Sequence, residues 1–571
     1  METVPTKTDD QQSSSKKKGG LRTMPFIIVN ETFEKVASFG LHANMILYLK
    51  NEYHMSNAAG ANVLFLWLAI SNLTPTFGAF FSDSYLGRFR VIALASLVTF
   101  MGMSTLFLTA VIPQARPPYC DVQLEEICKS ARPPHLALLF LSFGLMAIGA
   151  GGVRPCSLAF GADQLDKPEN PNNARILQSF FNWYYASVGI SVMISVTVIV
   201  YIQDKAGWAV GFGVPVVLMF LSVAMFLLGS SLYVKVKPNR SLFTGFVQVI
   251  SATWKNRHLA LPPTISNGIC YYQGDSINLL VPSDKLRVLN KACIIKNPEK
   301  ELDADGFAVA QWSLCSVKQV EELKALIKVL PIWSTGIMIA VTISQHSFPV
   351  LQATTMDRRL VAGFKIPAGS FSLFAIITLT IWVAIYDRVL VPFISKFTKR
   401  PRGLSFKQRM GIGLVISCLS TSTAALVERN RRAAALKQGL ANNPLGLVNM
   451  SAMWLAPQYC LSGLAEAFNA IGQIEFYYSQ FPKSMSSIAV SLFSLSMAMG
   501  NLVGSVIVGV LNHVTHNPSW VTNNLNQGHY DYYYCVLTVL CGINFLYYLI
   551  CSWAYGPCEG EQICDKDKAH H

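Results

Sequence analysis

The feature that most constrains this chain is a series of about twelve stretches in which roughly 20 consecutive residues are mostly apolar. Such a stretch crosses the hydrocarbon core of a bilayer as an α-helix, because a helix satisfies its own backbone hydrogen bonds there. Of the 571 residues, 52% are hydrophobic and only 14% are charged. Soluble domains carry about 25% charged residues, so the sequence predicts an all-α membrane protein.

The apolar stretches form two sets of six, separated by a long polar segment. Six spans, a long loop and six more spans are the layout of the major facilitator fold. We predict five regions: a disordered cytosolic tail at 1–23, an N-terminal six-helix half at 24–233, a cytosolic central loop at 234–324, a C-terminal six-helix half at 325–555 and a cytosolic tail at 556–571. The expected spans are 27–50, 60–82, 90–113, 135–158, 177–203, 210–233, 325–347, 369–393, 410–427, 450–476, 486–512 and 531–554.

The net charge of +14 is explained by orientation in a membrane, without invoking nucleic acid. Basic residues mark the cytosolic side of a membrane protein, and most basic connections share one side if both termini are cytosolic. The connection at 428–440 is the exception, because its Glu428–Arg432 cluster would lie outside. Either the first helix dominates the topology, or one predicted span is wrong.

The 13 cysteines show no metal-ligand spacing, and most lie in apolar stretches where we expect small buried hydrophobes. Cys120 and Cys128 differ, because they share a polar connection on the expected outer side. An oxidising compartment permits a disulfide there. Two free thiols fit the sequence equally well.

Charged residues cluster near the start of the first span, in the segment Asn30–Lys35. Glu31, Glu34 and Lys35 share one helix face, because residues three and four apart are neighbours on a helix. Ionisable groups inside a span are costly and mark proton or substrate paths. We predict a proton-coupling site here; the alternative is a helix start whose charges lie among the lipid headgroups.

A short turn joins the second and third spans, in the segment Gly78–Arg90. Its Asp83 lies five residues before Arg88. We expect charge pairs at this turn to hold the cytosolic side closed, and to break when that side opens. The alternative is a plain capped turn without a gating role.

Each half also contributes a charge at mid-span. Arg154 follows small residues in the fourth span, and its planar guanidinium suits a carboxylate or nitrate. Glu466 lies well inside the tenth span. We predict that both bind substrate; the alternatives are a snorkelling arginine and a structural hydrogen bond. Glu475, near the cytosolic end, is expected to be structural.

The sequence has no phosphate-binding glycine loop with lysine, no histidine-rich metal site and no nucleophile motif in a soluble segment. We therefore expect neither enzyme activity nor a cofactor or metal. The expected partners are a small-molecule substrate, protons and the lipid bilayer, and no nucleic acid. The oligomeric state is open.

Several of these motifs together resemble the plant nitrate and peptide transporter family, part of the proton-dependent oligopeptide transporter group of the major facilitator superfamily. The resemblance covers about residues 20–555. It rests on the collinear segments Glu31–Lys35, Gly78–Arg90, Gly161–Asp166, Ser283–Ala292, Leu330–Trp333, Gln473–Tyr477 and Pro482–Met485. It implies that Glu31, Glu34 and Lys35 couple protons, with Arg154 beside them, and that Glu466 faces the substrate.

The chain also departs from the family pattern. Arg154 stands where peptide carriers usually have lysine, and arginine cannot deprotonate. The helix-five segment Phe180–Gly189 moves the polar group to Ser187, which weakens the case for peptides. Ile343 stands about where a pocket histidine has been proposed in a nitrate carrier, and His346 lies nearer the outer end.

The resemblance thus implies a proton-coupled symporter, most simply of nitrate with low affinity or of another anion. A carrier of plant hormones or specialised metabolites is the next alternative, followed by a carrier of di- and tripeptides. A sensor shaped like a transporter is an alternative of a different class. The expected location is the plasma membrane.

Overall fold

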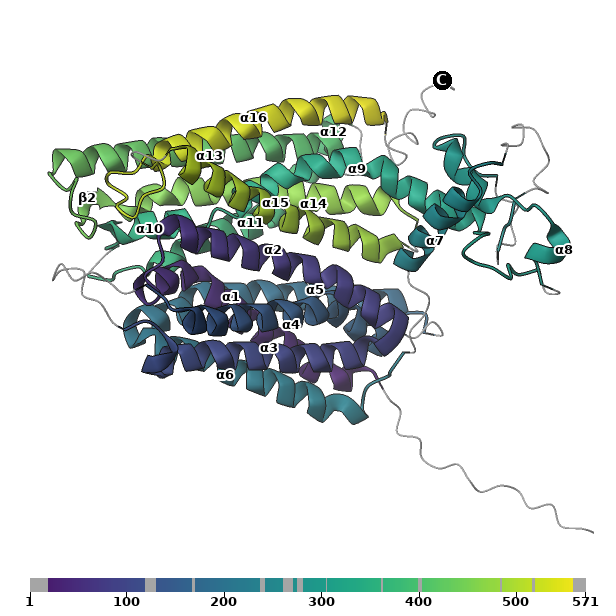
Figure 1. Cartoon of the computed structure of the whole chain (residues 1–571), viewed down its shortest axis with the longest axis horizontal. Helices are drawn as coiled ribbons and strands as arrows, with labels where there is room; N and C mark the ends of the chain where they lie inside the picture. Colours follow the sequence, from purple (N-terminus) through teal and green to yellow (C-terminus); the bar gives the residue numbers. More distant parts are fainter. Residues whose placement is uncertain are drawn as a thin grey trace, which may run out of the picture.

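The computed structural model describes residues 19–118, 130–166, 170–236, 242–259, 271–274, 281–303, 306–360, 363–398, 403–482, 485–515 and 519–557. These residues fold almost entirely into helices (Figure 1). Cys120 and Cys128 lie outside the described residues, so their pairing stays a prediction.

The first group of long helices lies side by side in the lower part of Figure 1. Its neighbours in the packing include the pairs α1 and α6, α2 and α4, and α3 and α4. The members are α1 (Met24–Asn51), α2 (Asn57–Phe81), α3 (Arg88–Val111), α4 (Pro133–Leu165), α5 (Asn173–Ile194) and α6 (Val200–Leu228).

The second group forms the upper part of Figure 1. It consists of α9 (Val317–Ile343), α10 (Ser347–Thr354), α11 (Leu373–Ile385), α12 (Val391–Thr398), α13 (Phe406–Lys437), α14 (Ala456–Gln480), α15 (Ser486–Val514) and α16 (Tyr530–Tyr555). The short strands β1 (Met356–Asp357) and β2 (Val448–Ser451) pair in parallel at one end.

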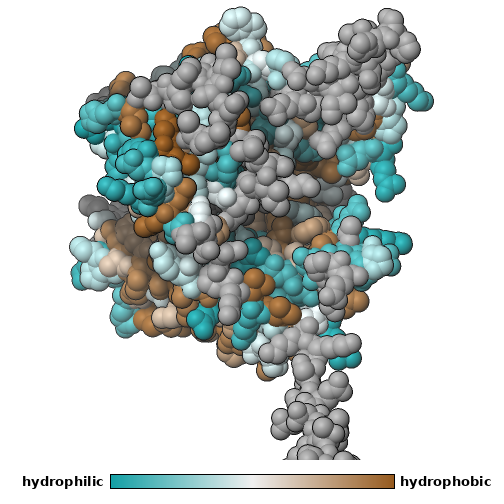
Figure 2. Space-filling model, turned by 90° about the vertical axis from the view of Figure 1, so that its right-hand side faces the viewer, coloured by the Kyte–Doolittle hydropathy of each residue, from teal (hydrophilic) through white to brown (hydrophobic). Residues whose placement is uncertain are grey.

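Two shorter helices separate the groups along the chain: α7 (Leu242–Lys255) and α8 (Pro298–Glu301). Both project from the right-hand end of the bundle in Figure 1, and α7 packs against α9. This end, which exposes many hydrophilic side chains (Figure 2), is the one that the basic residues assign to the cytosol.

Nine helical runs of the described residues are long and apolar enough to cross a membrane. One of them, Arg175–Ser231, has 57 residues and would be far longer than a bilayer is thick. Gly207 interrupts it with a φ of 80°, so that α5 and the start of α6 form one crossing and the rest of α6 forms the next. α1 and α14 are too polar to count among these nine runs. With these two helices added, the set is consistent with the twelve expected spans.

The span predicted at 410–427 is too short. α13 continues to Lys437, and its last turns contain Glu428 and Arg431. Both side chains are 0% exposed and form an ion pair, with Arg431 Nε donating to Glu428 Oε2 at 2.8 Å. The Glu428–Arg432 cluster conflicted with the expected orientation because it placed basic residues outside. Arg431 of this cluster is neutralised by Glu428 inside α13, so it does not count as a basic residue of an outer loop.

The two groups meet along α2 and α15, where Gly504 lies against the Phe65 ring. They also meet at the expected outer end. There α1 contacts α10 and the 3₁₀ turn Ala368–Ser372, and Arg358 approaches Asp204 of α6 to 3.8 Å. The outer end of the molecule is thus closed by contacts between the groups.

Candidate functional site

The charged residues of α1 form one compact cluster. Lys35 Nζ lies 3.1 Å from Glu31 Oε1 and donates to Glu34 Oε2 at 2.9 Å. Ser38, one turn further, donates to the second oxygen of Glu34 at 2.8 Å. Both carboxylates are 1% exposed and Lys35 is 8% exposed. The cluster is buried inside the first group of helices, so it is not a set of headgroup charges at a helix start.

The helix α4 approaches its neighbours closely because glycine lines its contact face. A Cβ on Gly151 would lie 2.6 Å from Thr74 Cβ of α2, and one on Gly149 would lie 2.7 Å from the Ala95 carbonyl oxygen of α3. This close packing fixes the height and rotation of α4. Arg154 follows directly on the same helix.

Arg154 is half-buried and makes no ion pair within 4 Å among the described residues. It is close enough to interact electrostatically with Glu34, Lys35 and His42. Its guanidinium therefore adds a second cation to a region where Lys35 is already shared between two carboxylates. A guanidinium without a carboxylate partner can bind an anion through two parallel hydrogen bonds.

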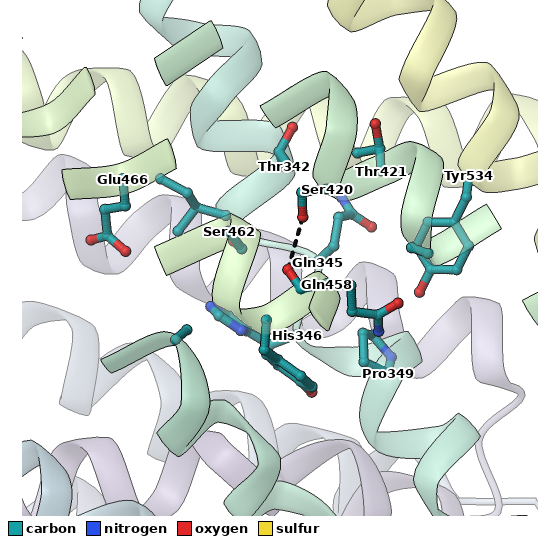
Figure 3. A pocket seen from close by; sticks show the side chains of 14 residues that line it. Thr342, Gln345, His346, Pro349, Ser420, Thr421, Gln458, Ser462, Glu466 and Tyr534 are labelled. Atoms are coloured by element: carbon teal, nitrogen blue, oxygen red, sulfur yellow. Dashed lines mark hydrogen bonds between the residues drawn. The ribbon is translucent and has the colours of Figure 1, made fainter. Parts of the chain in front are cut away.

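The second group of helices contains a cavity of about 60 Å³ (Figure 3). Glu466 of α14 and Tyr534 of α16 lie at opposite ends of the labelled side chains in Figure 3, with His346 between them. The cavity residues come from α9, α10, the turn between them, α11, α13, α14 and α16: Thr342, Ile343, Gln345, His346, Pro349, Ala375, Ser420, Thr421, Ala424, Gln458, Tyr459, Ser462, Glu466 and Tyr534.

Glu466 and Arg154 thus belong to different groups of helices. His42 of α1 lies close enough to both Arg154 and His346 to interact with them electrostatically. The His42 ring is stacked on Trp67, with centroids 4.1 Å apart, which fixes its orientation.

The turn between α2 and α3 has a different geometry from the simple pair expected. Arg88 lies 3.8 Å from Asp83, but its closer partner is Asp163 of α4, to which Nη1 donates at 2.6 and 2.8 Å. All three residues belong to the first group, so these contacts join three helix ends of one half. A role in closing the cytosolic side stays a prediction for Asp83 and Arg88.

Glu475 accepts a hydrogen bond from Arg409 of α13 at 2.7 Å, as its expected structural role requires. Sequence reasoning missed Asp163, which stood unremarked in the Gly161–Asp166 segment. His42 was not predicted either, although its position could have indicated it. His42 lies eight residues after Glu34 and therefore on the same face of α1.

Comparison with known proteins agrees with this architecture. The family model described as "PTR2: POT family" matches residues 89–525. The Arabidopsis thaliana proteins NRT1/PTR FAMILY 1.2 and 1.1 are 54% and 52% identical, over 98% and 99% of this chain and 94% and 98% of their own lengths.

Solved structures show the same fold at lower identity. An auto-inhibited POT family peptide transporter superposes with a TM-score of 0.70 at 20% identity, covering 95% of this chain and 98% of that one. The POT family transporter PepTSo gives 0.67 at 18% identity, covering 94% and 98%. The chain is an integral membrane transporter of the major facilitator fold, and it belongs to the POT family, within its NRT1/PTR branch.

Proposed function

We propose that this protein is a proton-coupled symporter of a small anion in the plasma membrane, and that nitrate is the first substrate to test. The observation that supports this proposal is the half-buried guanidinium of Arg154, which has no ion-pair partner in the described part of the chain and lies beside the Glu31, Glu34 and Lys35 cluster. Glu31, Glu34, Lys35 and Arg154 balance in charge, so a proton bound to one carboxylate would leave a positive charge for an anion to offset.

Proton coupling follows from the same cluster. A proton bound to Glu31 or Glu34 would weaken the pairing of that carboxylate with Lys35, so that more positive charge is available to an anion. Loss of the proton would restore the pair and expel the anion. The membrane potential supplies about 2.3 kcal/mol per charge per 100 mV, so more than one proton per monovalent anion would drive uptake inward.

The test is nitrate-dependent current in oocytes at pH 5.5 and 7.5, with chloride as the control anion. We expect inward current at pH 5.5 that is much smaller at pH 7.5. Arg154→Ala should raise the half-saturating nitrate concentration without reducing surface expression, and Arg154→Lys should recover only part because the planar fork is lost. Equal currents in the wild type and Arg154→Ala would exclude this side chain from the anion site.

An organic anion is the second candidate substrate. The cavity lined by Glu466 supports it, because its volume of about 60 Å³ could take a further part of a larger ligand. The sequence alternatives of a peptide carrier and a sensor lack such a supporting observation. Binding of nitrate and protons without any uptake would favour the sensor.

A further inference from the structure

The cavity in the second group contains side chains that carry hydrogen-bonding atoms without partners. Both amide atoms of Gln458, Nε2 and Oε1, are buried and unpartnered within the described structure, and so are the hydroxyl oxygens of Tyr459 and Tyr534. These side chains are 5%, 5% and 2% exposed. They belong to two helices, α14 and α16, and they line the same cavity.

Unpartnered polar groups of this kind are costly. A buried donor or acceptor without a partner costs about 1–3 kcal/mol, and native proteins retain few of them. A cavity needs roughly 10–15 Å³ to hold one water molecule, and this one is several times larger at about 60 Å³. The cavity therefore has room for part of a ligand.

Two neighbouring side chains of the same half, by contrast, have partners. Tyr533, adjacent to Tyr534 on α16, donates to Gln345 Oε1 at 2.7 Å. The Gln345 amide nitrogen in turn donates to the Val341 carbonyl oxygen at 3.0 Å. A tyrosine and a glutamine of the same region are thus paired, whereas Tyr534 and Gln458 line the cavity with side-chain polar atoms that have no partner within the described structure.

The chemistry of these groups restricts the ligand. Gln458 offers a donor and an acceptor, and a tyrosine hydroxyl can act as either. An uncharged group that both donates and accepts, such as an alcohol, satisfies them without bringing a charge near Glu466. A purely apolar group would leave them unpaired.

We propose that this cavity binds the hydroxyl-bearing end of an organic anion whose charged end binds at Arg154. The inference rests on the anion site proposed above and extends it to hydroxylated carboxylates. Gln458 and Tyr534 select such substrates, because each gains a hydrogen bond only from a polar ligand. Nitrate, which has no such end, binds without using the cavity.

The probes that test this are butyrate, hexanoate and octanoate, each compared with its ω-hydroxy derivative. Binding is measured by ligand-induced thermal stabilisation of the purified full-length protein. At one chain length the hydroxy acid should bind about three- to tenfold more tightly than its parent, the gain expected from one or two neutral hydrogen bonds. This advantage should disappear in Gln458→Leu and in Tyr534→Phe.

Tyr48→Phe is the control, because it removes a buried tyrosine hydroxyl that does not line the cavity and is paired with Thr109 in the first group. It should keep the hydroxyl advantage. Tyr534→Phe should fold normally, since it removes a group with no partner. Retention of the advantage in both Gln458→Leu and Tyr534→Phe would overturn the proposal, and so would its absence at every chain length, which would mean that the cavity holds only water.

Arg154→Ala separates this proposal from the anion site. If it weakens each acid and its hydroxy derivative equally, both proposals stand. If it leaves all affinities unchanged while the hydroxyl advantage persists, the anion site is wrong and the cavity assignment stands. If it weakens binding although the wild type shows no hydroxyl advantage, the cavity assignment is wrong and the anion site stands. Absence of any binding by acids and nitrate would overturn both.

Discussion

The two carboxylates of α1 share a single lysine, so protonation of either carboxylate changes the ion pairing of the whole cluster. Lys35 contacts Glu31 and Glu34 at 3.1 and 2.9 Å. Two carboxylates, Lys35 and the nearby Arg154 balance in charge, so one bound proton would leave the region with a net positive charge. Burial makes such a change in charge energetically large.

Glu34→Gln should abolish accumulation driven by a pH gradient while leaving surface expression intact. The amide keeps the shape of the side chain but cannot exchange a proton, and Lys35 still has Glu31 as its counter-ion. The measurement is uptake of labelled nitrate with and without the gradient, with counterflow exchange as the control for binding. An unchanged pH dependence would remove Glu34 from the proton path, and the same substitution at Glu31 would show whether one carboxyl or both take part.

The pair of Glu428 and Arg431 predicts an effect on stability. Both are 0% exposed, and Arg431 also donates to Asn526 Oδ1 at 2.8 Å. Glu428→Ala leaves a buried guanidinium without its counter-ion and should destabilise the fold by about 3–5 kcal/mol. Thermal unfolding of the purified protein measures this. The double variant Glu428→Leu with Arg431→Met should recover much of the loss, and an equal loss in both would contradict a charge-based cause.

At this scale the sequence predicts contacts that are local in the chain. Glu31, Glu34 and Lys35 are neighbours on any helix, so their meeting followed from spacing alone. The pairing of Arg88 with Asp163 could not be predicted in the same way, because it depends on where α3 and α4 end relative to each other. Whether the amide of Gln458 finds a partner depends on the positions of all the helices around the cavity, so no local sequence pattern predicts it.

At the scale of the helices, the close packing of α4 against its neighbours depends on glycine residues at the contact faces. A Cβ on Gly78 of α2 would lie 2.0 Å from the Gly151 carbonyl oxygen. This distance is far below van der Waals contact, and a backbone atom cannot rotate away. Small residues at such crossings let helices approach closely in membranes.

Gly151→Ala should therefore push α4 away from α2, displace Arg154 and lower both thermal stability and nitrate affinity. Gly144→Ala is the matched control on the same helix, because a Cβ there meets nothing within 4 Å. It should be neutral or stabilising, since alanine is favoured over glycine in a helix by about 1 kcal/mol. Equal behaviour of the two variants in an unfolding assay would mean that close packing of α4 is not required.

The helices also show why apolar windows find spans better than they find helix ends. α13 extends beyond its apolar stretch, because its last turns bury an ion pair that satisfies itself. α1 and α14 carry the polar residues of the candidate site, which lowers the hydropathy of the two helices most relevant to function. Hydropathy detects contact with lipid, whereas these segments are shaped by contact with other helices.

At the scale of the whole molecule, a polar contact joins the two groups at the outer end. Asn57, the first residue of α2, is 1% exposed. Its backbone nitrogen donates to Asn523 Oδ1 at 2.9 Å, and its side chain donates to the Thr522 carbonyl oxygen at 2.9 Å and to the Tyr530 hydroxyl at 3.1 Å. These bonds must break if the groups separate at this end during transport.

Asn57→Ala should therefore shift the population toward states that are open to the outside. Loss of its side-chain bonds removes about 1–3 kcal/mol from the closed state, enough to change the balance between states a few kcal/mol apart. Ala43 reports opening because it lies where α1 meets Gly369 of the second group. A cysteine at position 43 should react faster with a membrane-impermeant maleimide added outside when Asn57→Ala is present.

The labelling needs a background without competing outer thiols, so Cys120, Cys128 and the exposed Cys535 are replaced by serine. Asn62→Ala serves as the control on α2, because within the described structure its side chain accepts one bond, from Ser505 at 3.2 Å, and it lies further from the outer end. It should change the rate less than Asn57→Ala does. If Asn57→Ala leaves the labelling rate unchanged while unfolding shows a stable protein, the Asn57 contact does not restrain the outer side, and closure depends on the helix contacts of α1 with α10 and the Ala368–Ser372 turn instead.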